Sequence, residues 1–401
     1  MPLLPDPVPA SRHFTLISVD DHLIEPPDLF EGRMPAHLVE SAPRVVVTGD
    51  GSEAWIFEDQ HYPNIGLNAV VGRPKGEWSM EPARFDEMRK GCWDIHARIA
   101  DMDVAGVWAS LCFPSLIAGF AGVAFSRAKD QELGLACVRA WNDWHHEVWA
   151  GTYPERIIPL QITWINDPAV AAAEVLRNAE RGFKALSFPE NPVNLNLPSL
   201  QTDHWDPLLR ACEETGTVVC LHTGSAGAPA GGVAQLAGAP LELATTLFPV
   251  NACLAAANWL WARIPLRFPN IKIALSEGGI GWVPLLLDRL DYISTHSGSG
   301  KASSWSAALT PAEALQRNFW FCTIDDPTSL RVRDRIGVHR IMMEVDYPHA
   351  DSTWPSTQDL LFDRLRGIPR TEADRMTHLN AAELFRHPLP PSSWSEGAGP
   401  A

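Results

Sequence analysis

Eight short apolar runs, separated by segments with helical spacing, constrain the fold of this chain more than any other feature of its sequence. Strands that are covered by helices on both faces appear in a sequence as nearly continuous apolar runs, as these do. An alternation of such strands with helices is typical of an α/β fold with a parallel sheet. Eight repeats predict a (β/α)8 TIM barrel. The runs span residues 14–22, 107–113, 157–162, 183–188, 218–222, 271–277, 319–324 and 340–346.

Four of these runs end in side chains that are able to bind a metal ion. In the first run, Asp20 and His22 are two positions apart, so on a strand they point to the same face. In a parallel barrel the carboxyl ends of all strands meet at one face, which is where active sites lie. We therefore expect a metal site there, built from Asp20, His22, His222, Glu277, Asp346 and His349.

Each of these residues also has a simpler interpretation. A lone Asp-x-His is more often a polar turn, and His222 is also compatible with a satisfied core histidine. Glu277 can form a buried salt bridge or act as a general base without touching a metal. His349 can support a ligand or contact the substrate instead of binding the metal itself. Three helical histidines, His96, His145 and His146, are expected to be surface or packing residues.

The composition excludes several classes of partner. The chain has 48 acidic and 32 basic residues and a net charge of −16, without the basic cluster that a nucleic acid or an anionic membrane requires. No apolar run approaches the roughly 20 residues that span a bilayer. The seven cysteines are scattered without a C-x-x-C pair, which is typical of free thiols in a reducing compartment. We expect a cytoplasmic enzyme with a small-molecule substrate.

The chain is expected to form one barrel domain over residues 1–386, followed by a flexible tail over 387–401. An irregular stretch at about 40–90 interrupts the pattern after strand 1, and its hairpin-like segment predicts an insertion or lid. Sixteen tryptophans are many for this length, and they make a homodimer reasonable. Those that follow strand ends are expected to contact the apolar part of the substrate: Trp164, Trp282 and Trp354.

Several motifs resemble those of one enzyme superfamily. The chain is similar to the amidohydrolase superfamily, specifically to the amidohydrolase-related branch that contains aminocarboxymuconate-semialdehyde decarboxylase, over about residues 16–386. The resemblance implies a (β/α)8 barrel and a catalytic divalent metal that serves hydrolysis or non-oxidative decarboxylation. By motif, it implies Asp20, His22, His222 and Asp346 as ligands. The motifs are Val19–Pro26, Leu221–Gly224, Met343–His349, Pro154–Ile157 and Asn380–Phe385.

Two positions depart from the pattern of that superfamily. Its first strand often carries His-x-His or Glu-x-His, where this chain has Asp20 and His22, and its sixth strand commonly carries His where this chain has Glu277. A carboxylate can bridge two cations, and Lys184 stands too early in its strand to serve as a carbamylated bridge. We therefore expect two divalent metals per chain, with iron, zinc or manganese as candidates.

These features favour a metal-dependent hydrolase that cleaves an ester, a thioester or an amide with a bulky apolar acyl group. A bound cation lowers the pKa of its water, and Asp346 would move the proton to the leaving group, with Glu277 as a second catalytic residue. The alternative is a decarboxylase of an aromatic or unsaturated acid, because the same ligands permit both reactions. A third possibility is a catalytically silent barrel that binds a ligand.

Overall fold

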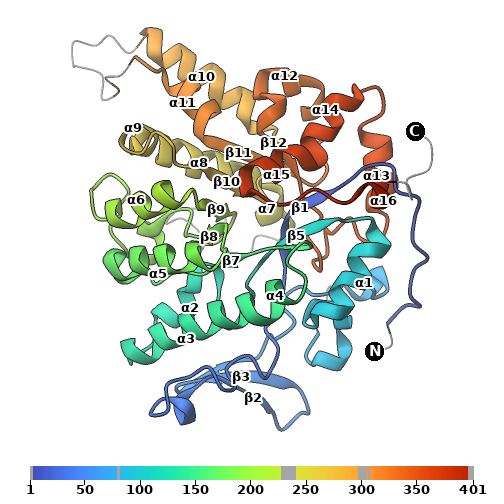
Figure 1. The fold of residues 1–401 in the computed structure, drawn as a ribbon, viewed down its shortest axis with the longest axis vertical. Helices are drawn as coiled ribbons and strands as arrows, with labels where there is room; N and C mark the ends of the chain where they lie inside the picture. Colours follow the sequence, from blue (N-terminus) through green and yellow to red (C-terminus); the bar gives the residue numbers. More distant parts are fainter. Residues whose placement is uncertain (1–2, 79–81, 227–240, 297–304, 306–307, 396–401) are drawn as a thin grey trace.

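The computed structural model describes residues 3–78, 82–226, 241–296, 305 and 308–395. At its centre lie two parallel sheets, with the strand orders β1-β5-β6 and β12-β11-β10-β9-β8-β7. Helices surround these strands (Figure 1). The parallel strands are β1 (Ile17–His22), β5 (Ala109–Phe113), β6 (Ile157–Ile158), β7 (Leu160–Gln161), β8 (Ala185–Ser187), β9 (Val218–His222), β10 (Ile273–Ser276), β11 (Phe319–Thr323) and β12 (Ile341–Met343).

The helices alternate with the strands along the chain, which confirms the α/β class expected from the sequence. They are α1 (Ile95–Ala105), α2 (Val123–Ser126), α3 (Gln131–Trp144), α4 (Ala150–Thr152), α5 (Pro168–Glu180), α6 (Asp206–Thr215), α7 (Leu241–Thr246), α8 (Phe248–Trp261), α9 (Ile264–Arg267), α10 (Trp282–His296), α11 (Pro311–Asn318), α12 (Arg333–Ile336), α13 (Thr357–Arg364), α14 (Arg370–Asp374), α15 (Asn380–Phe385) and α16 (Ser392–Ser395).

Local signals in the sequence explain several of these boundaries. Asp94 caps α1 by accepting a hydrogen bond from the amide of Ala97, and Asp167 caps α5 in the same way with Pro168 at its first position. Gly216 ends α6 with a φ of 66°, a conformation that glycine adopts at little cost. These caps fix where each helix ends and therefore where the following strand begins.

Strands β6 and β7 form one run that is interrupted by a proline. Pro159 has no N–H to donate to a neighbouring strand, so the ladder breaks at this residue. Its carbonyl still accepts hydrogen bonds from the amides of Lys184 and Ala185, at 2.9 and 3.2 Å. The chain therefore has eight parallel runs in the order expected from the sequence.

The first and last runs meet through hydrogen bonds beyond the end of β12. The amide of Asp346 donates to the carbonyl of Asp20 at 2.9 Å, and the amide of His22 donates to the carbonyl of Tyr347 at 2.6 Å. These bonds bring the carboxyl ends of β1 and β12 together. Closure of the strands into a complete barrel stays a prediction.

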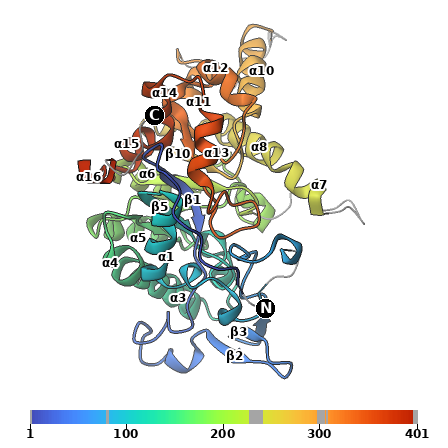
Figure 2. The ribbon, with the colours of Figure 1, turned by 90° about the vertical axis from the view of Figure 1, so that its right-hand side faces the viewer.

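The stretch between β1 and α1 contains an antiparallel sheet of three strands, β2 (Arg44–Val47), β3 (Glu53–Phe57) and β4 (Gln60–Tyr62). The hairpin expected there is present, with Val47 paired to Glu53 across the turn. The sheet lies at one end of the molecule, apart from the parallel strands (Figure 2). Its role as an insertion or lid remains a prediction.

The described part of the C-terminal tail packs against the body of the protein. The guanidinium of Arg12 lies 3.6 Å from the ring centre of Trp394, and the indole of Trp108 donates to the carbonyl of Pro388 at 3.1 Å. The last six residues of the tail, 396–401, lie outside the described residues. The flexibility expected for 387–401 as a whole stays a prediction.

The cysteines agree with the expectation of free thiols. All seven cysteines are free thiols, and six of them are buried. Among the described residues, no helix combines the length and the apolar character needed to cross a bilayer.

Candidate metal centre

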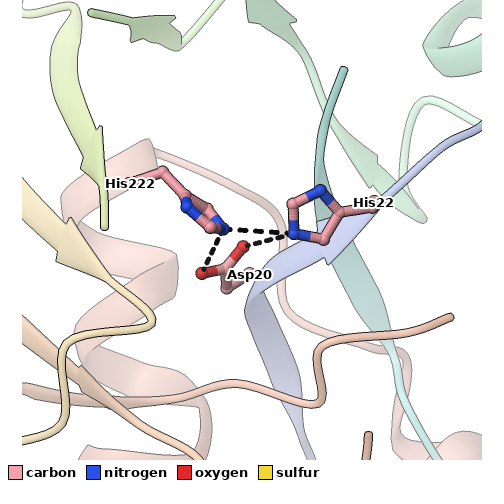
Figure 3. Close-up of side chains that lie close together, drawn as sticks. All are labelled: Asp20, His22 and His222. Atoms are coloured by element: carbon pink, nitrogen blue, oxygen red, sulfur yellow. Dashed lines mark hydrogen bonds and ion pairs between the residues drawn. The ribbon is translucent and has the colours of Figure 1, made fainter. Parts of the chain in front are cut away.

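Asp20, His22 and His222 converge at the carboxyl ends of β1 and β9 (Figure 3). The Nε2 atoms of the two histidines lie 3.1 Å apart. The carboxylate of Asp20 is 3.6 Å from His22 Nε2 and 3.5 Å from His222 Nε2. We call these three residues the inner group. Their donor atoms all face one point, as ligands of a single metal ion do.

Hydrogen bonds orient the imidazole of His222 and hold the backbone of His22. His222 Nδ1 lies 2.7 Å from the carbonyl of Thr223, so this nitrogen carries the proton and Nε2 keeps its lone pair free for a metal. The carbonyl of His22 accepts a hydrogen bond from the buried guanidinium of Arg98, which also donates to the carbonyl of Gly91 at 2.7 Å. Arg98 therefore holds the end of β1 in place.

Four further donors lie in the loops after β10 and β12. Glu277, Asp346, His349 and Asp351 have ligand atoms that all lie within 4.8 Å of one another, and we call them the outer group. His349 Nδ1 is 3.1 Å from Asp346 Oδ1. Asp346 and Glu277 have φ values of 57° and 54°, a left-handed conformation that costs free energy in residues other than glycine. Such strain is typical of functional sites.

The two groups are in contact. Asp346 Oδ1 lies 3.3 Å from His22 Nε2, and Glu277 Oε2 lies 3.5 Å from His222 Nε2. The amide of Glu277 donates to the carboxylate of Glu344 at 3.1 Å, which holds the strained loop against β12. The structure thus brings together all six residues that the sequence proposed as metal ligands.

Burial shifts the pKa values of these groups. The pKa values of Asp20 and Asp346 are raised well above the usual range, first by desolvation and then by repulsion from other carboxylates. Desolvation lowers the pKa of His222 to about 3 and that of His349 to about 4. The imidazoles are therefore neutral at pH 7, as metal ligands must be.

The buried oxygens of the cluster fit a divalent cation. Both carboxylate oxygens of Asp20 and Oδ1 of Asp346 have no hydrogen-bond donor among the described residues. A buried carboxylate without a donor is costly unless a cation neutralises it. Oxygen and imidazole donors without thiolate suit manganese, iron and zinc alike.

The sequence did not reveal every residue around the cluster. Phe120 stacks on His222 with ring centres 4.2 Å apart, and Phe113 meets the same imidazole edge-on at 5.0 Å. Phe113 ends an apolar run, so its position beside the cluster could have been predicted from the sequence. Phe120 begins a short 3-10 helix, Asp351 lies in a turn and Arg98 lies on α1; no motif marked these three residues.

The three tryptophans expected to contact the substrate are all buried. The indole of Trp282 donates to the carbonyl of Gly278 at 3.0 Å, and that of Trp354 donates to the carbonyl of Asp101 at 2.9 Å. Trp354 lines a separate cavity of about 300 Å³. In the described parts of the chain, no hydrogen bond or ring contact joins Trp164, Trp282 or Trp354 to the two groups, and their role in substrate binding remains a prediction.

The helical histidines lie away from the cluster. His145 is fully buried and stacks on Trp141 with ring centres 5.1 Å apart, and burial lowers its pKa to about 3. His146 packs against Phe183, and His96 lies 2.9 Å from the hydroxyl of Tyr153. These contacts agree with packing roles.

Solved structures share this fold. An amidohydrolase from Mycobacterium avium subsp. paratuberculosis superposes with a TM-score of 0.71 at 21% identity, over 93% of this chain and 99% of that one. 5-Carboxyvanillate decarboxylase from Sphingomonas paucimobilis has a TM-score of 0.61 at 22% identity, over 94% and 100%. A dihydroxybenzoic acid decarboxylase from Polaromonas, solved with manganese and 2-nitroresorcinol, has a TM-score of 0.64 at 16% identity, over 93% and 97%.

Sequence comparison adds a characterised relative and a family. The 2-amino-3-carboxymuconate-6-semialdehyde decarboxylase of Dictyostelium discoideum is 22% identical over 323 residues, which cover 78% of this chain and 82% of the relative. This relative and two of the solved structures are named as decarboxylases. The family model described as Amidohydrolase matches residues 35–387, which is most of the chain. The protein is therefore an enzyme of the amidohydrolase family, as its strand-end motifs predicted.

Proposed function

We propose that this enzyme is a metal-dependent, non-oxidative decarboxylase of an aromatic or unsaturated carboxylic acid. The observation that carries the proposal is the convergence of Asp20, His22 and His222 on one point, with the carboxyl group of Asp346 held beside them. The characterised relatives support the reaction, since their names specify decarboxylases of carboxylated benzenes or of a carboxymuconate.

The inner group would hold the divalent cation, with Asp346 as a further ligand or as its neighbour. When bound, such a cation withdraws electron density from a carboxylate or hydroxyl oxygen of the substrate. Manganese is the first candidate, because it is present in the structure of the Polaromonas relative. Iron and zinc remain candidates on the chemistry of the donors.

Asp346 is the proposed proton donor. In the reaction the bond between the carboxyl carbon and the adjacent carbon breaks, the electron pair stays on the substrate carbon, and CO₂ leaves. That carbon must then take up one proton. Its carboxyl group lies 3.3 Å from His22 Nε2 and 3.1 Å from His349 Nδ1, so it is placed beside the inner group where the substrate carbon would receive the proton.

Two aromatic rings would exclude water from the reacting carbon. Phe120 stacks on His222, and Phe113 meets the same imidazole edge-on. An apolar wall of this kind strengthens the electrostatic interactions inside the site and suits a planar substrate ring.

At the level of the fold, we propose that the eight runs close into one barrel through the hydrogen bonds between β1 and the end of β12, and that residues 40–90 cover its mouth.

The proposal is tested by CO₂ release. We would incubate the manganese-loaded protein with 2,6-dihydroxybenzoate, 5-carboxyvanillate and an aminocarboxymuconate semialdehyde, and measure CO₂ with a coupled assay. We expect turnover of at least one acid and its loss in Asp346→Asn. Asp359→Asn, which makes the same change at an exposed position on α13, is the matched control and should leave the rate unchanged.

Hydrolysis is the second candidate, and Glu277 favours it. A carboxylate 3.5 Å from His222 Nε2 is well placed to accept a proton from water, which a decarboxylase does not require. A panel of acyl esters, thioesters and amides separates the two reactions. Release of acid from this panel, with no CO₂ from any carboxylic acid tested, would replace the decarboxylase proposal.

A further inference from the structure

A cluster of basic side chains lies at the amino ends of the parallel strands, at the opposite end from the metal centre. Lys184, Lys272 and Arg340 directly precede β8, β10 and β12. The amides of Val218 and Val219 in β9 donate to the carbonyls of Lys184 and Lys272, both at 2.9 Å, so the two lysines flank the start of β9. Three cations therefore start from one end of the sheet.

Two of these cations line a surface cavity of about 220 Å³. Lys272 and Arg340 form part of its wall together with Trp320 of β11 and residues of α15. One water molecule takes up roughly 30 Å³ of the liquid, so the cavity has room for a small solute. The guanidinium of Arg340 lies 4.2 Å from the ring centre of Trp320, which holds the cation against the wall.

The cations of this cavity lack a counter-charge in the described part of the chain. There, neither Lys272 nor Arg340 forms an ion pair. The carboxylate of Glu383 also lines the cavity, but it lies 2.6 Å from Arg375 Nη1, which neutralises it. Burial and the guanidinium of Arg386 lower the pKa of Lys272, as a positive surrounding does. In a chain with a net charge of −16, such a patch is suited to attract an anion.

Two buried atoms of the cavity residues have no hydrogen-bond partner among the described residues. One is a donor, Arg340 Nε, and the other is an acceptor, Asn380 Oδ1. Asn380 is 2% exposed, and its amide nitrogen donates to the carbonyls of Val338 and Ile341, both at 2.8 Å, which fixes the side chain. A ligand that satisfies both atoms must accept from a cation and donate to an amide oxygen.

We propose that this cavity binds a hydrogen phosphate group, either as the free ion or at the end of a small phosphorylated molecule. Its unprotonated oxygens would accept hydrogen bonds from the ammonium of Lys272 and from Arg340 Nε. Its hydroxyl would donate to Asn380 Oδ1. Lysine and arginine are the side chains that bind phosphate in proteins, through hydrogen bonds strengthened by charge.

The phosphate site is separate from the metal centre and does not rest on the proposed function. Lys272 stands five residues before Glu277 and Arg340 six residues before Asp346, which correspond to roughly 17 and 20 Å of extended chain. A ligand in the cavity would therefore contact the starts of β10 and β12, whose far ends lead into the loops of the outer group. Binding to the native state also stabilises the fold.

The test measures binding of inorganic phosphate to the purified protein by isothermal titration calorimetry at pH 6. We expect the affinity to fall about tenfold or more in Lys272→Met, because a hydrogen bond to a charged group is lost while the apolar stem of the side chain is kept. Lys90→Met removes the same charge from a lysine that is 64% exposed and pairs with Asp94, and it should bind as the wild type does. Circular dichroism checks that each variant folds.

A second variant and two further anions complete the test. Arg340→Gln should also weaken phosphate binding about tenfold or more. Sulfate is a dianion without a hydrogen to donate, so we expect it to bind more weakly than phosphate. At pH 6 about half of a phosphate monoester carries a hydrogen, and glycerol 2-phosphate therefore distinguishes the two sources. Tighter binding of the monoester assigns the site to a phosphorylated molecule, and tighter binding of inorganic phosphate assigns it to the free ion.

Three results would overturn the inference. The first is the absence of phosphate binding up to millimolar concentration in the wild type. The second is equal affinity in the wild type, Lys272→Met and Arg340→Gln, which would place the bound phosphate elsewhere, for example at the metal centre. The third is equal affinity for sulfate and phosphate, which would mean that no hydrogen is donated to Asn380.

Discussion

The inner and outer groups differ in how the chain holds them. His22 and His222 lie on paired, buried strands, opposite Phe113 and Ser276, while Asp20 lies at a register shift of β1, where its carbonyl accepts from the amide of Asp346. The outer residues lie in loops beyond β10 and β12, where Glu277 and Asp346 have left-handed backbone conformations. Strand pairing therefore fixes the two inner imidazoles, whereas hydrogen bonds to neighbouring loops and side chains fix the outer donors.

This difference teaches which part of the site serves binding and which serves chemistry. A ligand on a paired strand moves little, which suits an ion that must stay bound through many turnovers. A strained loop keeps a reactive group in one position when other contacts hold it. One such contact is the hydrogen bond from the amide of Glu277 to the carboxylate of Glu344. The predictions below test this division, beginning with the largest effect.

Removal of an inner ligand should abolish activity. In His222→Ala one of the two imidazoles facing the ion is lost. Mutation of a residue that only supports a metal ligand lowers metal affinity about 10- to 100-fold. Removal of the ligand itself should therefore lower the affinity more than roughly 100-fold. Dialysis against Mn²⁺ and the CO₂ assay measure both effects. Full retention of tight binding in this variant would show that His222 is a packing residue.

Asp346→Asn should separate chemistry from metal binding. Asparagine tolerates the left-handed conformation that position 346 requires, so the loop keeps its shape. It cannot donate a carboxyl proton, and the rate of CO₂ release should fall roughly 10²- to 10⁴-fold. We expect the inner ion to remain. If the variant loses both the bound ion and the CO₂ release, Asp346 is a ligand of the inner group, and the distinction between a binding group and a chemical group fails.

The sequence predicted the residues of the inner group, but it predicted those of the outer group only in part. Asp20, His22 and His222 end apolar runs, and side chains two positions apart on a strand point to the same face. Asp351 lies in the loop after β12, and Phe120 begins a short 3-10 helix after β5. Loop geometry depends on contacts between distant segments, which local sequence does not encode.

Arg98 tests how firmly the inner strand is held. Its guanidinium is buried, donates to the carbonyls of His22 and Gly91, and lies 4.3 Å from the ring centre of Tyr347. Arg98→Met leaves these carbonyls without donors and should lower the free energy of unfolding by about 3 kcal/mol. Urea unfolding measures this change.

The same variant should weaken the binding of Mn²⁺ to the inner group about tenfold, because His22 loses its support. Arg366→Met is the control: its side chain is 71% exposed, pairs with Asp363 and lies 5.7 Å from the ring centre of Phe362, so its effect should stay within about 0.5 kcal/mol. Equal effects of the two substitutions would mean that Arg98 does not position the end of β1.

Glu25 gives the smallest effect and a pH dependence. It lies three residues after His22 and accepts hydrogen bonds from the amide of Ser115 and the indole of Trp141. Burial raises its pKa from 4.5 to about 7. The native state therefore favours the protonated carboxyl group. Its contribution to stability is fully present below pH 4.5 and is lost as the pH rises through about 7.

Glu25→Gln removes this titration and keeps an oxygen that can accept both hydrogen bonds. Between pH 6 and 8 the wild type should lose about 1 kcal/mol more unfolding free energy than the variant. Urea unfolding at several pH values measures the difference. A pH-independent difference would mean that Glu25 is already ionised in the native state. In that case the loop after β1 would tolerate a buried charge, and the inner group would be less isolated from water than the outer one.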